Sequence, residues 1–185
     1  FISGLENEHG AWVEGENHIG DLLTRYYSSL FTTTNATDLD PVLNGVELRV
    51  TKDMNSKLLK PFVLAEVLSA LKQMDADTAP GPDGLPLLFY KQFWEKIGRG
   101  VSKAILTVLN SGTIPISLNL TFISLILKIQ SPKKVSDFRS INLSNVLYKL
   151  IPKVLANHLK PLLPNLVSKT QSAFMSDRLI KIIFL

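Results

Sequence analysis

The 185-residue sequence contains no cysteine, which excludes disulfide bonds and thiolate metal sites. This composition is compatible with an intracellular protein. The first fifteen residues are acidic and lack the basic and apolar regions of a signal peptide. Long hydrophobic runs are also absent, because the most apolar stretch, residues 114–129, is interrupted by Pro115, Ser117, Asn119, Thr121 and Ser124. We therefore expect no membrane-spanning helix.

Carboxylates are scarce in the second half of the chain. Beyond Glu95 the only acidic side chains are those of Asp137 and Asp177, and nowhere do two aspartates stand side by side. The three histidines, His9, His18 and His158, lack the spacing of a metal site or a catalytic triad. We therefore assign no catalytic residue and no metal ligand to this sequence.

Positive charge, in contrast, is concentrated in the last third. Residues 1–127 carry ten Lys and Arg against fourteen Asp and Glu, whereas residues 128–185 carry ten against two, a net charge of +8. A solvated basic face is one explanation of this asymmetry. Its size favours a polyanionic partner, such as nucleic acid or the phosphates of a nucleotide.

Apolar residues recur at helical spacing in four segments, which are residues 16–31, 51–59, 64–74 and 86–109. Residues 32–50 have no such period and predict a connector. Gly98 and Gly100 each cost a helix about 1 kcal/mol relative to alanine. We therefore expect the longest of the four helices to kink or break near these glycines.

The pattern changes after residue 118. Residues 119–129 alternate between apolar and polar positions and residues 138–144 form a second short run, which together predict a β-hairpin with Lys133 and Lys134 at its tip. Asn145 is a candidate N-cap for a helix from Val146 to about Leu163. Pro152 should kink or break that helix at a cost of about 3 kcal/mol. The expected fold class is α+β and mostly helical.

The stretch DTAPGPDGLP, residues 77–86, separates two predicted helices with three prolines and two glycines. Proline fixes φ and glycine permits positive φ, so this composition predicts a rigid turn. Asp83 is placed to cap the next helix or to bond within the turn. A turn of this kind is most often a plain surface connector.

Several blocks of the sequence, taken in order, carry a resemblance to a known family. They are APGPDGLP with FYKQFW after it, then TFISLILKI, DFRSINLSNVLYKLIPKVLANHLK and QSAFMSDRLI. In order and spacing they resemble the amino-terminal half of the reverse transcriptase of LINE-type non-LTR retrotransposons, over about residues 51–180. The resemblance implies a partial right-hand polymerase fold, with lead-in helices, a fingers β-hairpin and an incomplete palm. It divides the chain into a lead-in helix and linker, residues 1–50, and the amino-terminal fingers part of a reverse transcriptase domain, residues 51–185.

The resemblance also implies binding residues and partners. Lys128 and Arg139 match the cations that hold the triphosphate of the incoming nucleotide, where an arginine fork and a lysine point charge suit phosphate oxygens. The partners implied are an RNA template, a DNA primer and nucleoside triphosphates, with Mg²⁺ as the cofactor of the intact enzyme. The QSAF block matches a family segment that lies near the template. For Phe174, simple core packing is the alternative to a contact with that template. The candidate nucleic-acid contacts are Lys133, Lys134, Lys149, Lys153, Gln171, Ser172, Phe174 and Arg178.

The sequence also departs from the family pattern. Leu127 and Ser140 replace family prolines, and Val63 stands where a capping threonine is common. The family's catalytic aspartates lie downstream of the QSAF block, so we expect this chain to bind no Mg²⁺. Since the chain begins with Phe1, we expect a piece of a longer reading frame, truncated before those aspartates.

The expected function is that of a fragment of an RNA-directed DNA polymerase that is inactive in isolation. A nuclear location is compatible with the resemblance. The alternatives are a non-catalytic, basic, nucleic-acid-binding remnant and a pseudogene product.

Overall fold

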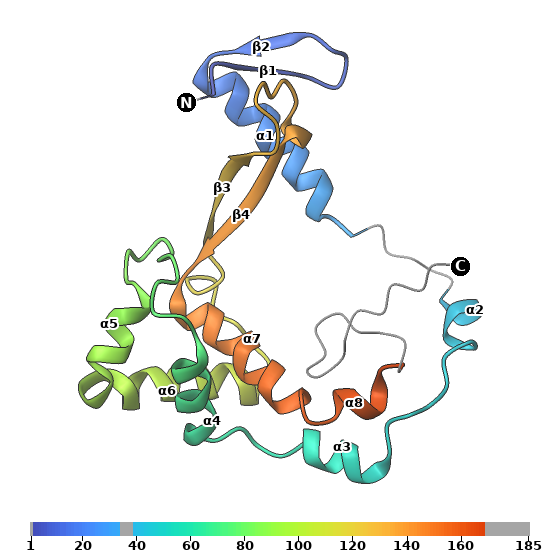
Figure 1. Ribbon diagram of the computed structural model, residues 1–185, viewed down its shortest axis with the longest axis vertical. Coiled ribbons are helices and arrows are strands. Elements are labelled where there is room, and N and C mark those ends of the chain that lie inside the picture. Colours follow the sequence, from blue (N-terminus) through green and yellow to red (C-terminus); the bar gives the residue numbers. More distant parts are fainter. Residues whose placement is uncertain (1, 34–38, 169–185) are drawn as a thin grey trace. The chain divides into compact units, whose positions relative to one another are not determined.

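The computed structural model describes residues 2–33 and 39–168 (Figure 1). Its internal contacts divide the chain into two compact units. The first, called here the hairpin unit, consists of Phe1–Val46 and Ile123–Asn142, and the second, the helical unit, of Glu47–Phe122 and Leu143–Leu185. The expected division at residue 50, between a lead-in helix with its linker and the fingers part of a reverse transcriptase domain, stays a prediction.

The hairpin unit begins with two short antiparallel strands, β1 (Gly4–Glu6) and β2 (Trp12–Glu14), in which Leu5 pairs with Val13. Between them the side-chain oxygen of Asn7 accepts hydrogen bonds from the backbone amides of His9, at 3.0 Å, and Ala11, at 2.9 Å. The sequence did not predict these strands, because three residues are too few to show an alternating pattern.

Helix α1 (Glu16–Phe31) has the bounds predicted from its apolar stripe. That stripe contributes Ile19 and Tyr27 to a small core with Leu5, Val135 and Phe138. The core therefore joins β1, α1 and the connection of the second hairpin within one unit. A four-residue helix, α2 (Asp40–Leu43), lies in the segment that was predicted to be a plain connector.

The predicted second hairpin is present as β3 (Thr121–Leu127) and β4 (Phe138–Ser144). Much of its apolar surface is open to solvent: Phe122, Ile126 and Ile141 are each more than two fifths exposed. A two-stranded ribbon has little stability of its own. The connection between β3 and β4 is instead fixed by the buried side chains of Val135 and Phe138.

The helical unit contains α3 (Lys52–Leu58), α4 (Leu64–Gln73), α5 (Leu87–Gln92), α6 (Trp94–Ser111), α7 (Val146–Leu159) and α8 (Leu163–Leu166). Helices α4, α6 and α7 pack against one another, and α5 packs on α6. Each fully buried aliphatic side chain in this core stabilises the fold by about 1.5–3 kcal/mol. The core residues are Val67, Ala70, Leu71, Leu87, Tyr90, Ile105, Val108, Val146, Leu150, Ile151 and Val154.

The break expected at Gly98 and Gly100 was placed wrongly. The long helical segment divides at Phe93, between α5 and α6, and α6 continues through both glycines. Gly98 is buried beneath the indole of Trp94, and a Cβ at this position would lie 2.6 Å from Trp94 Cε2. The glycine therefore serves close packing inside the helix rather than ending it. The helix ends before Gly112, whose φ of 71° lies in the left-handed region.

Helix α7 also differs from its prediction. It runs unbroken through Pro152, whose ring lies at an exposed position, and it ends at Leu159 rather than near Leu163. At the start of α4, Val63 supplies no side-chain cap. Glu66 compensates in part, because its Oε2 accepts a hydrogen bond from the Val63 amide at 2.9 Å.

Candidate functional site

Four of the predicted site residues lie in and beside the connection of the β3–β4 hairpin. Lys128 directly follows β3, Lys133 and Lys134 lie in the connection, and Arg139 is the second residue of β4. All four are exposed. The structure therefore brings these cations together in one segment of the hairpin unit.

Asp137 fixes the conformation of this connection. Its Oδ2 accepts hydrogen bonds from the backbone amides of Lys133 and Lys134, both at 2.9 Å. These two bonds, with smaller contributions from the charges of Lys134 and Lys128, hold the pKa of the Asp137 carboxyl below its ordinary value. The carboxylate of Asp137, which lies within the connection, therefore binds backbone and shapes the loop.

Lys128 and Arg139 differ in how much of their side chain is available. The Lys128 amide donates to the Asp137 carbonyl at 2.8 Å, and its Nζ donates to the Ser136 carbonyl at 2.7 Å. One of the three ammonium donors is thus occupied. Within the described residues, the Arg139 guanidinium has neither an ion pair nor a hydrogen bond in this conformation.

Lys149 and Lys153 lie elsewhere, on α7 of the helical unit. The Lys149 Nζ donates to the Ala79 carbonyl at 2.6 Å. Burial lowers the pKa of Lys149, and the nearby Asp83 carboxylate opposes that shift. Lys149 therefore supports the 77–86 turn in this structure, and its contact with nucleic acid stays a prediction. Lys153 is half-buried.

The remaining candidates, Gln171, Ser172, Phe174 and Arg178, lie outside the described residues. Their assigned roles stay predictions.

The turn at residues 77–86 packs on the start of α7. The Asp83 amide donates to the Asn145 side-chain oxygen at 3.2 Å. A Cβ on Gly81 would overlap the backbone at Ser144 and Asn145, so only glycine permits this approach. Asn145 occupies the predicted N-cap position of α7, but its side chain makes no cap hydrogen bond and instead binds the turn.

Asp83 makes further contacts that the sequence left open. Its Oδ1 accepts a hydrogen bond from the Leu85 amide at 3.1 Å, so the side chain bonds within the turn. Burial of Tyr90, together with the charge of Asp83 and a hydrogen bond to it, raises the pKa of Tyr90 to about 12. The turn is thereby joined to α5 as well as to α7.

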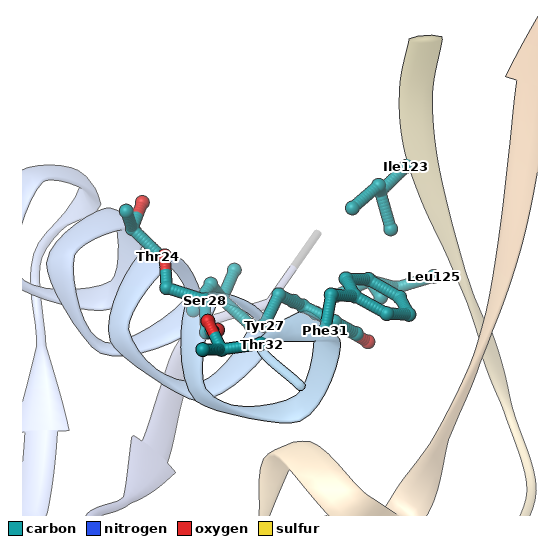
Figure 2. Close-up of a pocket in the computed structure, with 8 residues that line it drawn as sticks. Thr24, Tyr27, Ser28, Phe31, Thr32, Ile123 and Leu125 are labelled. Carbon is teal, nitrogen blue, oxygen red and sulfur yellow. The ribbon is translucent and has the colours of Figure 1, made fainter. Parts of the chain in front are cut away.

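Two features were missed from the sequence. One is a contact among His158, Glu66 and the Lys57 carbonyl, described below. The other is an open apolar groove of about 590 Å³ in the hairpin unit, between the second half of α1 and β3 (Figure 2). The apolar stripe of α1, which continues to Phe31 at 61% exposure, was the sequence signal for it. The lining residues are Leu23, Thr24, Tyr27, Ser28, Phe31, Thr32, Ile123 and Leu125.

Among residues 2–33 and 39–168, no group of three or more His, Asp or Glu is arranged to hold an ion. These described residues do not fit a two-metal polymerase site, and we derive no catalytic step through Mg²⁺. In the same part of the chain, every helix is too short or too polar to cross a membrane.

Comparison with known proteins gives one relationship that covers nearly the whole chain. The sequence is similar to the Transposon TX1 uncharacterized 149 kDa protein of Xenopus laevis, with 25% identity over 181 residues. The alignment covers 97% of this chain and 14% of that protein, so the chain spans about one seventh of its relative's length. No protein-family model matches the sequence. The similarity supports a transposon origin for the chain.

Proposed function

We propose that the chain is the fingers part of a transposon-derived RNA-directed DNA polymerase, which binds nucleic acid and nucleoside triphosphate without catalysing their reaction alone. One observation carries the proposal: a chain similar to a transposon protein over 97% of its length presents four cations around one ordered β-hairpin connection. Two of these cations, Lys128 and Arg139, occupy the positions that the family resemblance assigns to triphosphate binding.

The geometry suits phosphate in two ways. Arg139 offers an uncommitted guanidinium fork for two oxygens of a triphosphate, and Lys128 offers its two remaining ammonium donors. Lys133 and Lys134 extend into solvent from backbone that Asp137 holds in place. They would contact the sugar-phosphate backbone and add affinity without reading sequence.

Nucleic-acid binding is tested with a fluorescently labelled single-stranded RNA and the complete chain. Anisotropy measured over a series of salt concentrations should give an affinity that falls steeply with salt. Lys133→Glu with Lys134→Glu should weaken binding to several unrelated RNA sequences alike. The matched control is Lys52→Glu with Lys57→Glu on α3 of the helical unit. Affinity that is independent of salt, or equal for the two double variants, would refute this part of the proposal.

Catalysis is tested by primer extension on an RNA template with Mg²⁺ and all four nucleoside triphosphates. We expect no extension product from the purified chain, because clustered carboxylates are needed to hold the ions. Extension that persists through repeated purification and is lost in the Lys128→Ala, Arg139→Ala double variant would refute this expectation.

A second candidate function is that of a basic nucleic-acid-binding remnant. It is favoured by the net charge of +8 in residues 128–185 combined with only two acidic residues there. Both candidates predict RNA binding. Only the polymerase-derived fingers predict a specific contribution of Lys128 and Arg139 to binding of a nucleoside triphosphate, so that measurement separates the two.

A further inference from the structure

His158 lies at the meeting point of three helices in the helical unit. On α7, its side chain is 14% exposed, and its ring centroid is 4.8 Å from that of Phe62. Its Nδ1 is 2.8 Å from Glu66 Oε1 on α4, and its Nε2 is 3.1 Å from the Lys57 carbonyl oxygen on α3. Both ring nitrogens therefore face oxygen atoms.

Those two oxygens fix the proton count. A carbonyl oxygen only accepts hydrogen bonds, as does an ionised carboxylate, and a neutral imidazole has a single N–H to donate. Both bonds form together only if the His158–Glu66 pair holds one proton more than a neutral imidazole beside a carboxylate. The geometry thus corresponds to an imidazolium that donates from both nitrogens.

The two acceptors also belong to parts of α4 and α3 that have few other stabilising contacts. Glu66 uses its other oxygen to bond the Val63 amide at the start of α4, where a capping side chain is missing. Lys57 lies in the last turn of α3, a seven-residue helix with no buried residue. A short helix without buried side chains depends on a few contacts for its position. Three residues before α3, the guanidinium of Arg49 donates a hydrogen bond to the Leu166 carbonyl at 3.3 Å.

We propose that His158, Glu66 and the Lys57 carbonyl form a pH-sensitive latch, which holds α3 against α4 and α7 while the imidazole is protonated and releases it on deprotonation. The proposal does not depend on nucleic-acid or nucleotide binding. It goes beyond that function, because it concerns the docking of the segment that precedes α4.

The charged groups around the latch are few. From α4, Glu66 is the carboxylate that faces His158. On α3, the Lys57 ammonium pairs with the Asp53 carboxylate at 2.7 Å. The group of α3 that contacts His158 is the backbone carbonyl of Lys57. From α7, the other ionisable residues are Tyr148, Lys149 and Lys153, and α7 contains no aspartate or glutamate. Glu66 is therefore the group that sets the proton affinity.

The surroundings of His158 set the direction of the pH dependence. The hydrogen bond to Glu66 is the largest cause that raises the pKa of His158 above its ordinary 6.5, with the Lys57 carbonyl adding to it against the effect of burial. A raised pKa means that the latch contributes fully below the ordinary pKa of histidine. Its contribution is lost as the pH rises through the raised pKa.

Hydrogen exchange of the complete chain, followed by mass spectrometry, tests the latch. After correction for the intrinsic exchange rate, amides of residues 52–59 should be protected roughly tenfold more at about pH 5.5 than at about pH 9, which is the effect expected for one charge-assisted bond. Protection of α6 should be equal at the two pH values. Equal protection of residues 52–59 at both pH values would overturn the proposal.

Variants assign the effect to these residues. In His158→Gln and in Glu66→Gln, protection of residues 52–59 should be low at both pH values, whereas His9→Gln, on the exposed first hairpin, should keep the full pH dependence. Persistence of the pH dependence in both variants would overturn the proposal. If either variant unfolds, as shown by loss of protection in α6, the unsubstituted chain and His9→Gln still decide the question.

Discussion

The backbone amide of Asp83 donates a hydrogen bond to the side-chain oxygen of Asn145, 62 residues away, at 3.2 Å. This bond joins the proline- and glycine-rich turn to the residue that precedes α7. The contact of Gly81 with the backbone at Ser144 and Asn145 belongs to the same junction. The turn therefore fixes the point at which β4 ends and α7 begins, which is more than a connector between helices requires.

Gly81→Ala should lower the free energy of unfolding by about 2 kcal/mol, because the added methyl group overlaps backbone atoms that cannot move aside as a side chain can. Urea denaturation measures the change. The control is Gly100→Ala, where a Cβ meets no atom within 4 Å. That variant should raise the free energy of unfolding by about 0.5–1 kcal/mol, because alanine favours the helix. Equal effects of the two substitutions would contradict the packing described for the turn.

Lys149→Ala should lower the stability of the chain, whereas Lys134→Ala should change RNA binding and leave stability unaffected. Loss of the bond from Lys149 to the Ala79 carbonyl should cost about 1 kcal/mol of stability. Loss of the exposed Lys134 side chain should leave stability unchanged and lower the salt dependence of RNA binding by about 0.7 in the logarithmic slope. Urea denaturation and RNA anisotropy, applied to both variants, check this. A stability loss confined to Lys134→Ala would show that the roles are assigned the wrong way round.

Asp137→Asn should weaken RNA binding, although it removes a negative charge beside four cations. The reason is that the carboxylate holds the amides of Lys133 and Lys134, and an amide oxygen is a poorer acceptor. Glu8→Gln, in the same unit, removes a charge without that function and serves as the control. Tighter RNA binding by Asp137→Asn would mean that charge alone governs the interaction.

The same carboxylate predicts a dependence on acid. Because the pKa of Asp137 is held below its ordinary value of 3.8, the ordered connection should be fully present above that pH. It should be lost as the pH falls through the lowered pKa. Amide chemical shifts of Lys133 and Lys134, followed by NMR from neutral pH downward, should move together with a midpoint below 3.8. Independent midpoints for the two amides would contradict their shared acceptor.

Pro152→Ala should stabilise the chain by about 2 kcal/mol. Proline costs an interior helix position on the order of 3 kcal/mol, part of which is offset because it also restricts the unfolded chain. The substituted side chain is exposed and fills no core space, so the effect should come from the backbone. Thermal and urea denaturation measure it. A decrease in stability would show that α7 requires the proline for its packing.

The elements with strong patterns could be predicted from the sequence. The stripe of α1 gave both of its ends, and alternation gave the β3–β4 hairpin. The break at Phe93 could not be predicted, because propensity disfavours Gly98 in a helix and only the packing of Trp94 explains why it is there. Tertiary contact outweighs propensity at that position.

The candidate site was predictable to a similar degree. The family resemblance identified Lys128 and Arg139, and the hairpin pattern placed Lys133 and Lys134 at its tip. Neither gave the role of Asp137, since a single acid in a basic loop shows no sequence signal. The latch joins His158 to Glu66 across 92 residues. Contacts of that separation depend on how α3, α4 and α7 pack, which no local pattern specifies.

Binding of a fluorescent deoxynucleoside triphosphate to the complete chain tests the proposed function most directly. Titrations should show that Lys128→Ala and Arg139→Ala each weaken binding roughly tenfold, the effect of losing one charge-assisted phosphate contact. Arg99→Ala, at an exposed position of α6, should bind as the unsubstituted chain does. Equal affinity of all four proteins, with RNA binding intact, would contradict the polymerase-derived function and leave the nucleic-acid-binding remnant.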